Sequence, residues 1–196
     1  MLLNKKILKY KRILLFKWGM LLFMLFEKPI FKKIGKHISI GKDYTFVNHN
    51  YISIGNNFIC LERLRIEAID KYGIQYFKPE INIGNNVTFN TDVHIGCVNK
   101  VYIGNNVLLA SRIFISDHSH GATNIESLSI PPNLRPLISK GPVIIEDNVW
   151  IGEGVSILSN VTIGKNSIIG ANSVVTRSFG ENSIIAGVPA KLIKNI

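Results

Sequence analysis

The chain contains little cysteine, and the two that it has exclude a disulfide framework. Cys60 and Cys97 lack the spacing of metal ligands. Each stands in a strand-like context, which predicts a reduced side chain in the core. This usage is compatible with the cytoplasm, where thiols stay reduced.

A long hydrophobic run is also missing near the N-terminus. The uncharged apolar stretch there covers residues 19–26, far short of the ~20 residues that span a bilayer. No small-residue cleavage site follows it, and Lys28, Lys32 and Lys33 come directly after. We therefore expect neither a membrane-spanning helix nor a cleaved signal peptide.

Acidic residues are almost absent from the first segment. Residues 1–36 contain one acid, Glu27, against ten Lys or Arg, which leaves 12 acids and 13 bases for residues 37–196. The net charge of +10 therefore divides into +9 and +1. The basic segment lacks interleaved aromatics for base stacking, so the sequence does not predict nucleic-acid binding.

Residues 1–36 form a predicted amphipathic helix, because helical spacing gathers apolar side chains on one stripe and cations opposite. The stripe contains Ile7, Leu14, Trp18, Leu21 and Leu25, and the opposite face contains Lys5, Lys9 and Arg12. Two interpretations stay open. The helix lies in the interface of an anionic membrane, or it packs against a solenoid end or a neighbouring subunit.

The C-terminal third repeats an apolar residue every six positions. One row contains Ile145, Ile151, Ile157, Ile163, Ile169 and Val175, and a row two residues earlier contains Val143, Val149, Val155, Val161, Ser167 and Ser173. A period of six fits neither a helix nor one long strand. It predicts short strands joined by turns in an all-β parallel β-helix, with buried strands of a sandwich as the alternative.

The same repeat recurs earlier as Ile-Gly pairs followed by Asn-Asn, and Gly and Asn suit tight corners with left-handed backbone. The solenoid is expected over residues 37–188, with excursions at about 70–80 and 117–142 and a tail at 189–196. The longer break, rich in Ser, Pro and Gly, is predicted to project and to wall a site, since long loops in solenoids are usually functional or disordered.

Two histidines open that longer break. His118 and His120 follow a predicted strand at residues 112–116, where a neutral imidazole under a loop suits a general base. The other three, His37, His49 and His94, lie in or near repeat turns and strands, which favours a surface or packed role. A metal site is not expected, because a zinc carbonic anhydrase solenoid would need three converging histidines.

Several motifs carry a family resemblance over roughly residues 80–194. They are residues 114–121 (FISDHSHG), 135–137 (RPL), 148–152 (NVWIG), 168–177 (IIGANSVVTR) and 185–191 (IAGVPAK). Together they resemble the hexapeptide-repeat O-acetyltransferases, which include the galactoside, maltose and xenobiotic acetyltransferases. The first two motifs are most similar to the surface-polysaccharide (O-antigen or capsule) acetyltransferases. The resemblance implies a left-handed parallel β-helix and a homotrimer with active sites between subunits.

The resemblance also implies residue roles. His118 matches the catalytic histidine and His120 the second one, and Asn90 matches an acceptor-sugar contact. The acidic pair of the family has no counterpart, since residues 95–98 read IGCV. Asp117 is expected on the substrate side, either orienting the imidazole or capping its turn. Acetyl-CoA is expected to bind at Trp150, Glu153, Ala171, Thr176, Arg177 and Lys194.

The expected activity is acetyl-CoA-dependent O-acetylation of a sugar hydroxyl on a surface polysaccharide or its lipid-linked precursor. His118 would act as base in direct attack on the thioester, with a backbone N–H at or near Glu153 meeting the oxyanion. The alternatives are N-acetylation of a nucleotide-linked amino sugar and a non-catalytic solenoid. The expected location is cytoplasmic, with peripheral contact at the inner face of the cytoplasmic membrane as an option.

Overall fold

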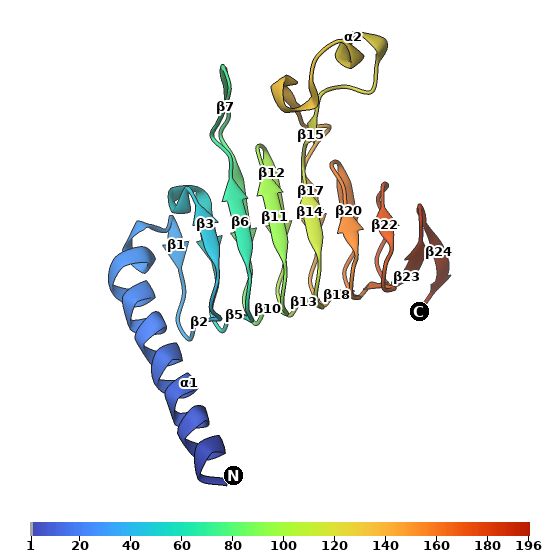
Figure 1. The fold of residues 1–196 in the computed structure, drawn as a ribbon. Coiled ribbons are helices and arrows are strands. Elements are labelled where there is room, and N and C mark those ends of the chain that lie inside the picture. The colour runs from blue at the N-terminus through green and yellow to red at the C-terminus, as the bar shows by residue number, and fades with distance from the viewer. Residues whose placement is uncertain (1) are drawn as a thin grey trace.

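The computed structural model describes the backbone of residues 2–196 and the side chains of residues 10, 11 and 13–196. Its body is a parallel β-helix in which three sheets wrap around one core (Figure 1). Sheet A contains β1 (Lys33–Ile34), β4 (Ile52–Ile54), β9 (Glu80–Ile83), β12 (Lys100–Ile103), β17 (Val143–Ile145) and β20 (Val161–Ile163). Sheet B contains β2 (Ser39–Ile40), β5 (Ile59–Cys60), β10 (Thr88–Phe89), β13 (Leu108–Leu109), β18 (Trp150–Ile151), β21 (Ile168–Ile169), β23 (Ser183–Gly187) and β24 (Ala190–Asn195). Sheet C contains β3 (Thr45–Val47), β6 (Arg65–Ala68), β11 (His94–Cys97), β14 (Phe114–Ser116), β19 (Ser156–Ile157) and β22 (Val174–Val175).

The predicted hexads form the core as expected. Every residue of the two apolar rows from Val143 to Val175 is at most 1% exposed. Trp150 pairs in parallel with Ile168, 18 residues later, so each regular coil consists of three hexads. Branched side chains suit such a wall because they are stiff and pack well on a pleated surface. The prediction of a parallel β-helix is therefore confirmed.

One corner carries a ladder of asparagines with left-handed backbone. Its members are Asn57, Asn86, Asn106, Asn148, Asn166 and Asn182, all with φ between 56° and 60°. Each side-chain amide donates to the Oδ1 of the next asparagine at 2.8–3.0 Å. Asparagine tolerates this conformation better than other side chains, and here it also links neighbouring coils.

Two other corners matter for the site. The B–C corner joins sheet B to sheet C and includes residues 90–93, 110–113, 152–155 and 170–173. The C–A corner joins sheet C to the next coil of sheet A and includes residues 98–99, 117–142, 158–160 and 176–178.

Both excursions leave the C–A corner on the same side of the solenoid (Figure 1). The first, residues 69–79, contains the hairpin β7 (Lys71–Tyr72) and β8 (Gln75–Tyr76). The second, residues 117–142, contains β15 (Ser119–His120), α2 (Ile125–Leu128), η4 (Pro132–Leu134) and β16 (Leu137–Ile138). At the far end, the predicted tail at residues 189–196 contains β24, which pairs antiparallel with β23.

The N-terminal segment is helical, and its C-terminal end packs against the first coil while its first helix projects away from the solenoid (Figure 1). It contains α1 (Leu2–Leu22), the π-helix η1 (Phe23–Glu27) and the 3₁₀ turn η2 (Lys28–Ile30). Phe23 is fully buried against the rings of Phe31 and Tyr44, and Met20 packs beside the same core. Among the described residues, no helix is long and apolar enough to cross a membrane.

The predicted apolar stripe of this helix is exposed where the structure describes it. Leu14, Trp18, Leu21 and Leu25 all face solvent in this chain. Further exposed apolar side chains lie between them, at Ile13, Leu15, Phe16, Leu22, Met24 and Phe26. The exposed apolar surface is therefore wider than one stripe. Four side chains of the prediction, Lys5, Ile7, Lys9 and Arg12, lie outside the described set.

Candidate active site

His118 stands where β14 ends and the long excursion begins, at the C–A corner. Its imidazole lies over Gly96 of the neighbouring strand, because a Cβ added to Gly96 would be 3.2 Å from the His118 Cε1. A larger residue at position 96 would displace the ring. The side chain of His118 is only 9% exposed, so it sits in a recess at the edge of the sheet.

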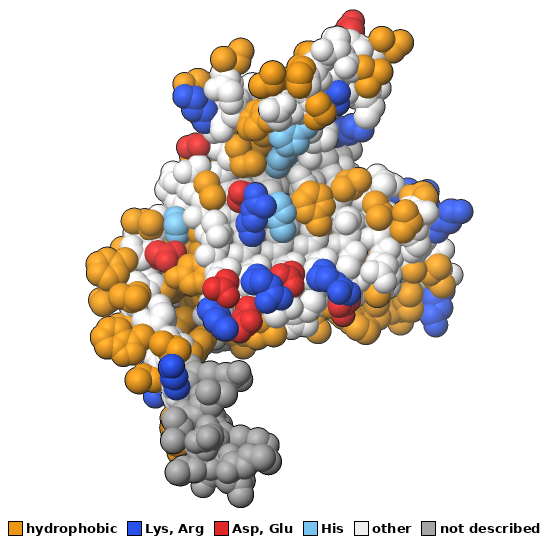
Figure 2. Space-filling model, viewed as in Figure 1, with side chains coloured by type: hydrophobic (Ala, Val, Ile, Leu, Met, Phe, Trp, Pro, Cys, Tyr) orange, Lys and Arg blue, Asp and Glu red, His pale blue; other side chains and the backbone are white. Residues whose placement is uncertain are grey.

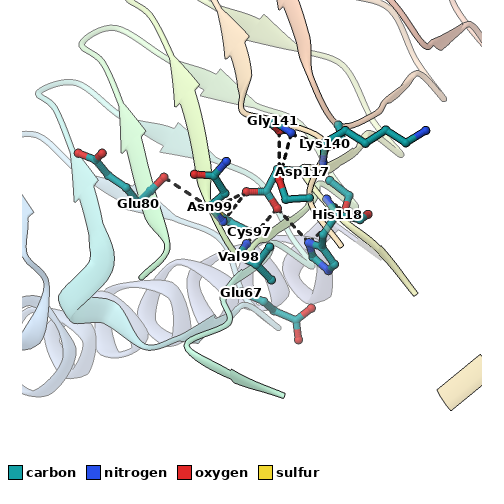
Figure 3. Close-up of polar contacts among 12 residues, drawn as sticks. Glu67, Glu80, Cys97, Val98, Asn99, Asp117, His118, Lys140 and Gly141 are labelled. Carbon is teal, nitrogen blue, oxygen red and sulfur yellow. Dashed lines mark hydrogen bonds and ion pairs between the residues drawn. The ribbon is translucent and has the colours of Figure 1, made fainter. Parts of the chain in front are cut away.

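Asp117 holds this imidazole in place (Figure 3). Its Oδ1 lies 3.0 Å from the Nδ1 of His118 and also accepts the N–H of Val98 at 2.9 Å. Its Oδ2 accepts the N–H of Asn99 at 2.8 Å and the thiol of Cys97 at 3.3 Å. The Asp117 side chain is 0% exposed. In this chain it therefore both orients the imidazole and caps the turn, and it offers no surface to a substrate.

These contacts define the tautomer of the neutral His118 imidazole. A carboxylate only accepts hydrogen bonds, so the Nδ1 must carry the proton that points at Asp117. The Nε2 then has a free lone pair and, among the described side chains and backbone, no hydrogen-bond partner. No unpartnered side-chain nitrogen or oxygen in that set is buried. The Nε2 is therefore open to a proton-bearing substrate.

Burial keeps the thiol of Cys97 protonated. Burial first, and then the nearby charge of Asp117, raise the pKa of Cys97 far above its ordinary value. The same residue was predicted to be a reduced core cysteine, and both cysteines are buried and free. The Cys97 thiol consequently acts as a donor to the carboxylate that holds His118.

His120 is held away from the sheet by the other excursion. Its Nδ1 lies 3.2 Å from the hydroxyl of Tyr72, whose ring is in edge contact with the imidazole. The Tyr72 hydroxyl donates to the backbone oxygen of Asn133 at 2.6 Å. The Gln75 side chain pairs with both backbone groups of Leu137, at 2.7 and 3.2 Å. The hairpin and the long excursion thus form one wall beside His118.

The remaining predicted site residues fall at separate places in one chain. Asn90, Glu153 and Ala171 occupy the B–C corner, and Trp150 lies on the outer face of sheet B. Thr176 and Arg177 occupy the C–A corner, on the side of His118, and Lys194 pairs with Ile184 at the terminal strands. A single chain therefore does not bring the predicted set together.

Thr176 and Arg177, at the C–A corner, border a pocket near the end of the solenoid. This pocket of ≈ 450 Å³ is lined by Thr176, Arg177, Pro189, Ala190, Lys191 and Leu192. The guanidinium of Arg177 lies 5.2 Å from the centre of the Phe179 ring. At the B–C corner, Glu153 forms a 2.6 Å ion pair with Arg112. The Glu153 N–H makes no hydrogen bond to any described group.

Comparison with known proteins identifies the family. A model described as "Bacterial transferase hexapeptide (six repeats)" matches residues 142–177. The chain is 42% identical over 151 residues to WbbJ of Escherichia coli (strain K12). That protein is described as a lipopolysaccharide biosynthesis O-acetyl transferase. The match covers 75% of this chain and 73% of WbbJ. The chain belongs to the hexapeptide-repeat transferase family.

Solved structures of acyltransferases share the fold. A mutant of AntD, an N-acyltransferase from Bacillus cereus, in complex with dTDP-4-amino-4,6-dideoxyglucose and coenzyme A, has a TM-score of 0.68 at 25% identity and 86% coverage of both chains. A maltose O-acetyltransferase from Clostridium difficile 630 has a TM-score of 0.57 at 30% identity, covering 86% of this chain and 71% of that one. This transferase is an acyltransferase, and its fold is the left-handed parallel β-helix that the resemblance implied.

Some residues around the site of this transferase were missed from sequence. Tyr72 and Gln75 lie in an excursion that showed only a break in the repeat, with no chemical motif. His94 was interpreted as a packed or surface histidine, yet it pairs with Glu67 beside the site. Successive side chains of a strand point to opposite faces, so the sequence of β11 could have placed His94 and Gly96 together on the outer face. Among residues with described side chains, no three His, Cys, Asp or Glu gather as metal ligands.

Proposed function

We propose that this transferase moves an acetyl group from acetyl-CoA to a sugar hydroxyl of a surface polysaccharide or its lipid-linked precursor. The observation that carries the proposal is the Asp117–His118 pair, whose imidazole has an oriented Nδ1–H and an open Nε2. The similarity to WbbJ supports a glycan acceptor, and the similarity to AntD, whose structure contains coenzyme A, supports an acyl-CoA donor.

The proposed reaction is a direct attack on the thioester. His118 accepts the hydroxyl proton on Nε2 while the sugar oxygen bonds to the acetyl carbonyl carbon. The N–H of Glu153, which lacks a partner within the described chain, donates to the oxyanion. The C–S bond then breaks, and His118 returns its proton to the departing sulfur of coenzyme A. Asp117 stabilises the imidazolium that exists between the two proton transfers.

We propose that the enzyme is a homotrimer with its active sites between subunits. The predicted coenzyme residues lie on two corners of one chain, so a complete site requires the C–A corner of one subunit to face the B–C corner of another. Exposed apolar residues on the outer face of sheet B, at Ile59, Leu108 and Trp150, suit contact with another subunit. On this basis we propose that Asn90 contacts the acceptor sugar and that the predicted coenzyme residues contact acetyl-CoA.

The proposed location is the cytoplasm, with peripheral contact at the inner face of the membrane. Many apolar side chains of α1 and η1 are exposed, and Lys11 and Lys17 on α1 and Lys33 on β1 are exposed in the same segment. The one acid of the segment, Glu27, is committed to Tyr44 and His49 at 2.6 and 3.2 Å. A helix of this kind suits the headgroup region of an anionic bilayer, where lipid-linked precursors are displayed.

N-acetylation of a nucleotide-linked amino sugar is the second candidate. The observation that favours it is the similarity to AntD, an N-acyltransferase whose structure contains an amino sugar nucleotide. The same base would then receive a proton from the amine after it attacks the thioester. A non-catalytic solenoid is the third candidate, and it predicts no binding of coenzyme A.

The deciding experiment combines wild type and His118→Ala with acetyl-CoA labelled in the acetyl group and glycan extracted from the host. We expect label in the glycan with wild type only, and its release as acetate by mild alkali, because esters hydrolyse there and amides persist. Alkali-stable label would favour the amino sugar. Equal transfer by both variants would refute His118 as the base.

A further inference from the structure

The outer face of sheet C carries a second histidine–carboxylate pair that the proposed mechanism does not use. The Nε2 of His94 on β11 lies 3.0 Å from the Oε2 of Glu67 on β6. The guanidinium of Arg65 lies 2.9 Å from the same carboxylate. Figure 2 shows acidic, basic, histidine and hydrophobic side chains adjoining one another on this face, below the projecting excursions.

This pair lies beside the recess of His118. Gly96 is in register with Glu67 on the adjacent strand, and the His118 ring lies over Gly96. His94 precedes Gly96 by two residues and so points to the same face. Adjacent strands are about 4.8 Å apart and alternate residues about 7 Å, so both histidine–carboxylate pairs flank one glycine.

The His94–Glu67 pair leaves a hydrogen-bond acceptor open. In the neutral imidazole, the His94 Nε2 carries the proton because the carboxylate only accepts, and the Nδ1 keeps its lone pair. This Nδ1 has no partner among the described groups, and since no such unpartnered atom is buried, it faces solvent. The His94 side chain is 31% exposed. A hydroxyl that reached this face could therefore donate to it.

The charge of the cluster favours a neutral ligand. Burial alone would raise the pKa of Glu67, but hydrogen bonds from Arg65 and His94 outweigh burial and lower it. Glu67 is thus ionised at neutral pH, and Arg65 balances its charge. An ammonium group would gain little here, whereas an uncharged hydroxyl needs only an acceptor.

An aromatic ring completes the surface. Phe114 on β14 is in register with His94, and the two rings lie 5.3 Å apart at 54°. The Phe114 side chain remains partly exposed. An apolar platform beside a few convergent polar groups is the usual composition of a small-molecule site. A pyranose, with one C–H face and a rim of hydroxyls, has the matching chemistry.

We propose that Phe114, His94 and Glu67 form the acceptor subsite of this transferase. The hexopyranose packs its C–H face on Phe114, and one hydroxyl donates to the His94 Nδ1, which Glu67 orients. A neighbouring hydroxyl of the same sugar then reaches the Nε2 of His118. The role of this subsite in catalysis rests on the proposed acetyl transfer. The subsite favours a hydroxyl acceptor over an amine.

The first test is kinetic and uses a panel of methyl hexopyranosides with acetyl-CoA. His94→Phe removes the acceptor nitrogen, so we expect the acceptor KM to rise about threefold to tenfold, the loss of one neutral hydrogen bond. The KM for acetyl-CoA stays at its wild-type value. His94→Asn restores an acceptor near the Nδ1 position and recovers part of the loss. A wild-type acceptor KM in His94→Phe overturns the subsite.

The matched control is His49→Phe, which breaks another histidine–glutamate pair, His49–Glu27. His49 follows β3, which is three strands away from β14 in sheet C. We expect no change in acceptor KM. Circular dichroism and thermal unfolding show that each variant is folded before its kinetics are compared.

The second test separates this proposal from the proposed function. Binding of the same glycosides is measured by saturation-transfer NMR on wild type, His94→Phe and His118→Ala. We expect binding to weaken in His94→Phe and to persist in His118→Ala. Binding that depends on His94 without any acetyl transfer by wild type would refute the acetyltransferase function and keep the subsite. Binding to none of the glycosides, or undiminished binding to His94→Phe, would refute the subsite.

Discussion

The Oδ1 of Asp117 accepts from the Nδ1 of His118 at 3.0 Å and from the N–H of Val98 at 2.9 Å. One buried oxygen thereby ties the candidate base to the turn that ends the preceding coil. The imidazole is therefore positioned by the solenoid itself, although its residue opens a long excursion. Rigid support of this kind is what a general base requires.

Asp117→Asn should separate orientation from folding. An amide has one acceptor oxygen, so it cannot satisfy Val98, Asn99 and the His118 Nδ1–H together. We expect kcat to fall by about 10²-fold or more with the KM for acetyl-CoA unchanged. We also expect a loss of about 1–3 kcal/mol in unfolding free energy from the unsatisfied buried group. Steady-state kinetics and urea unfolding measure the two effects.

Glu80→Gln is the matched control for that substitution. Glu80 is a carboxylate close to the same turn, but its side chain bonds to Asn82 and Lys100 and makes no contact with His118. Its kcat should equal that of wild type. A normal kcat in Asp117→Asn would show that the His118 ring needs no carboxylate partner.

The two excursions should behave as one unit. Gln75 satisfies both backbone groups of Leu137, and the Tyr72 hydroxyl donates to Asn133. We expect Gln75→Ala and Tyr72→Phe to increase amide hydrogen exchange in residues 119–138, measured by mass spectrometry, because the excursion loses its support. Tyr76→Phe, on the same hairpin, should leave that exchange unchanged, because the Tyr76 ring contacts Lys71 and its hydroxyl makes no hydrogen bond to the described residues of the excursion. Wild-type exchange rates in all three variants would mean that residues 119–138 are stable without the hairpin.

The core and the place of the base were predictable because both leave a local mark. The hexad rows at residues 143–175 repeat without interruption, and each predicted member is buried. The break that His118 opens is visible as a loss of that period. Such signals depend only on neighbours within one or two coils.

The contacts around the base were not predictable, because they join residues that no period relates. Gln75 and Leu137 are 62 residues apart, and Glu67 and His94 are 27 apart. Their pairing depends on the length of the intervening excursions, which the sequence does not fix. The role of Asp117 was left open for a related reason, since only its complete burial shows that one carboxylate both caps and orients.

Buried thiols should make stability depend on alkaline pH. Burial raises the pKa of Cys60 from 9.0 to about 12, so the folded state keeps a proton that the unfolded state releases above about pH 9. The unfolded state then binds fewer protons, and stability falls as pH rises from about 9 towards 12, with a slope approaching ~1.4 kcal/mol per pH unit. Below pH 9 the contribution is fully present.

Urea unfolding of wild type and Cys60→Ala between pH 8 and 10.5 measures this effect. Other groups titrate in the same range, so the informative quantity is the difference in slope between the two proteins. We expect the variant to lose stability less steeply above pH 9. Parallel lines for the two proteins would show that the Cys60 thiol ionises as easily when folded as when unfolded.

The exposed helix should bind anionic membranes through both its charge and its apolar side chains. We expect the full chain to sediment with vesicles that contain phosphatidylserine and to remain free with phosphatidylcholine alone, with binding weakened by salt. Replacing Leu14, Trp18 and Phe26 by serine should lower the partition coefficient at least about tenfold, because each side chain contributes on the order of 1 kcal/mol or more when it leaves water. The triple serine variant at Ile125, Leu128 and Leu134 is the control, since these residues are also exposed but lie on the excursion.

Membrane binding that survives the helix variant would leave α1 as a packing element. A loss of trimer in that variant, measured by light scattering, would assign the apolar surface to subunit contact, because a membrane-docking face has no reason to hold subunits together in solution.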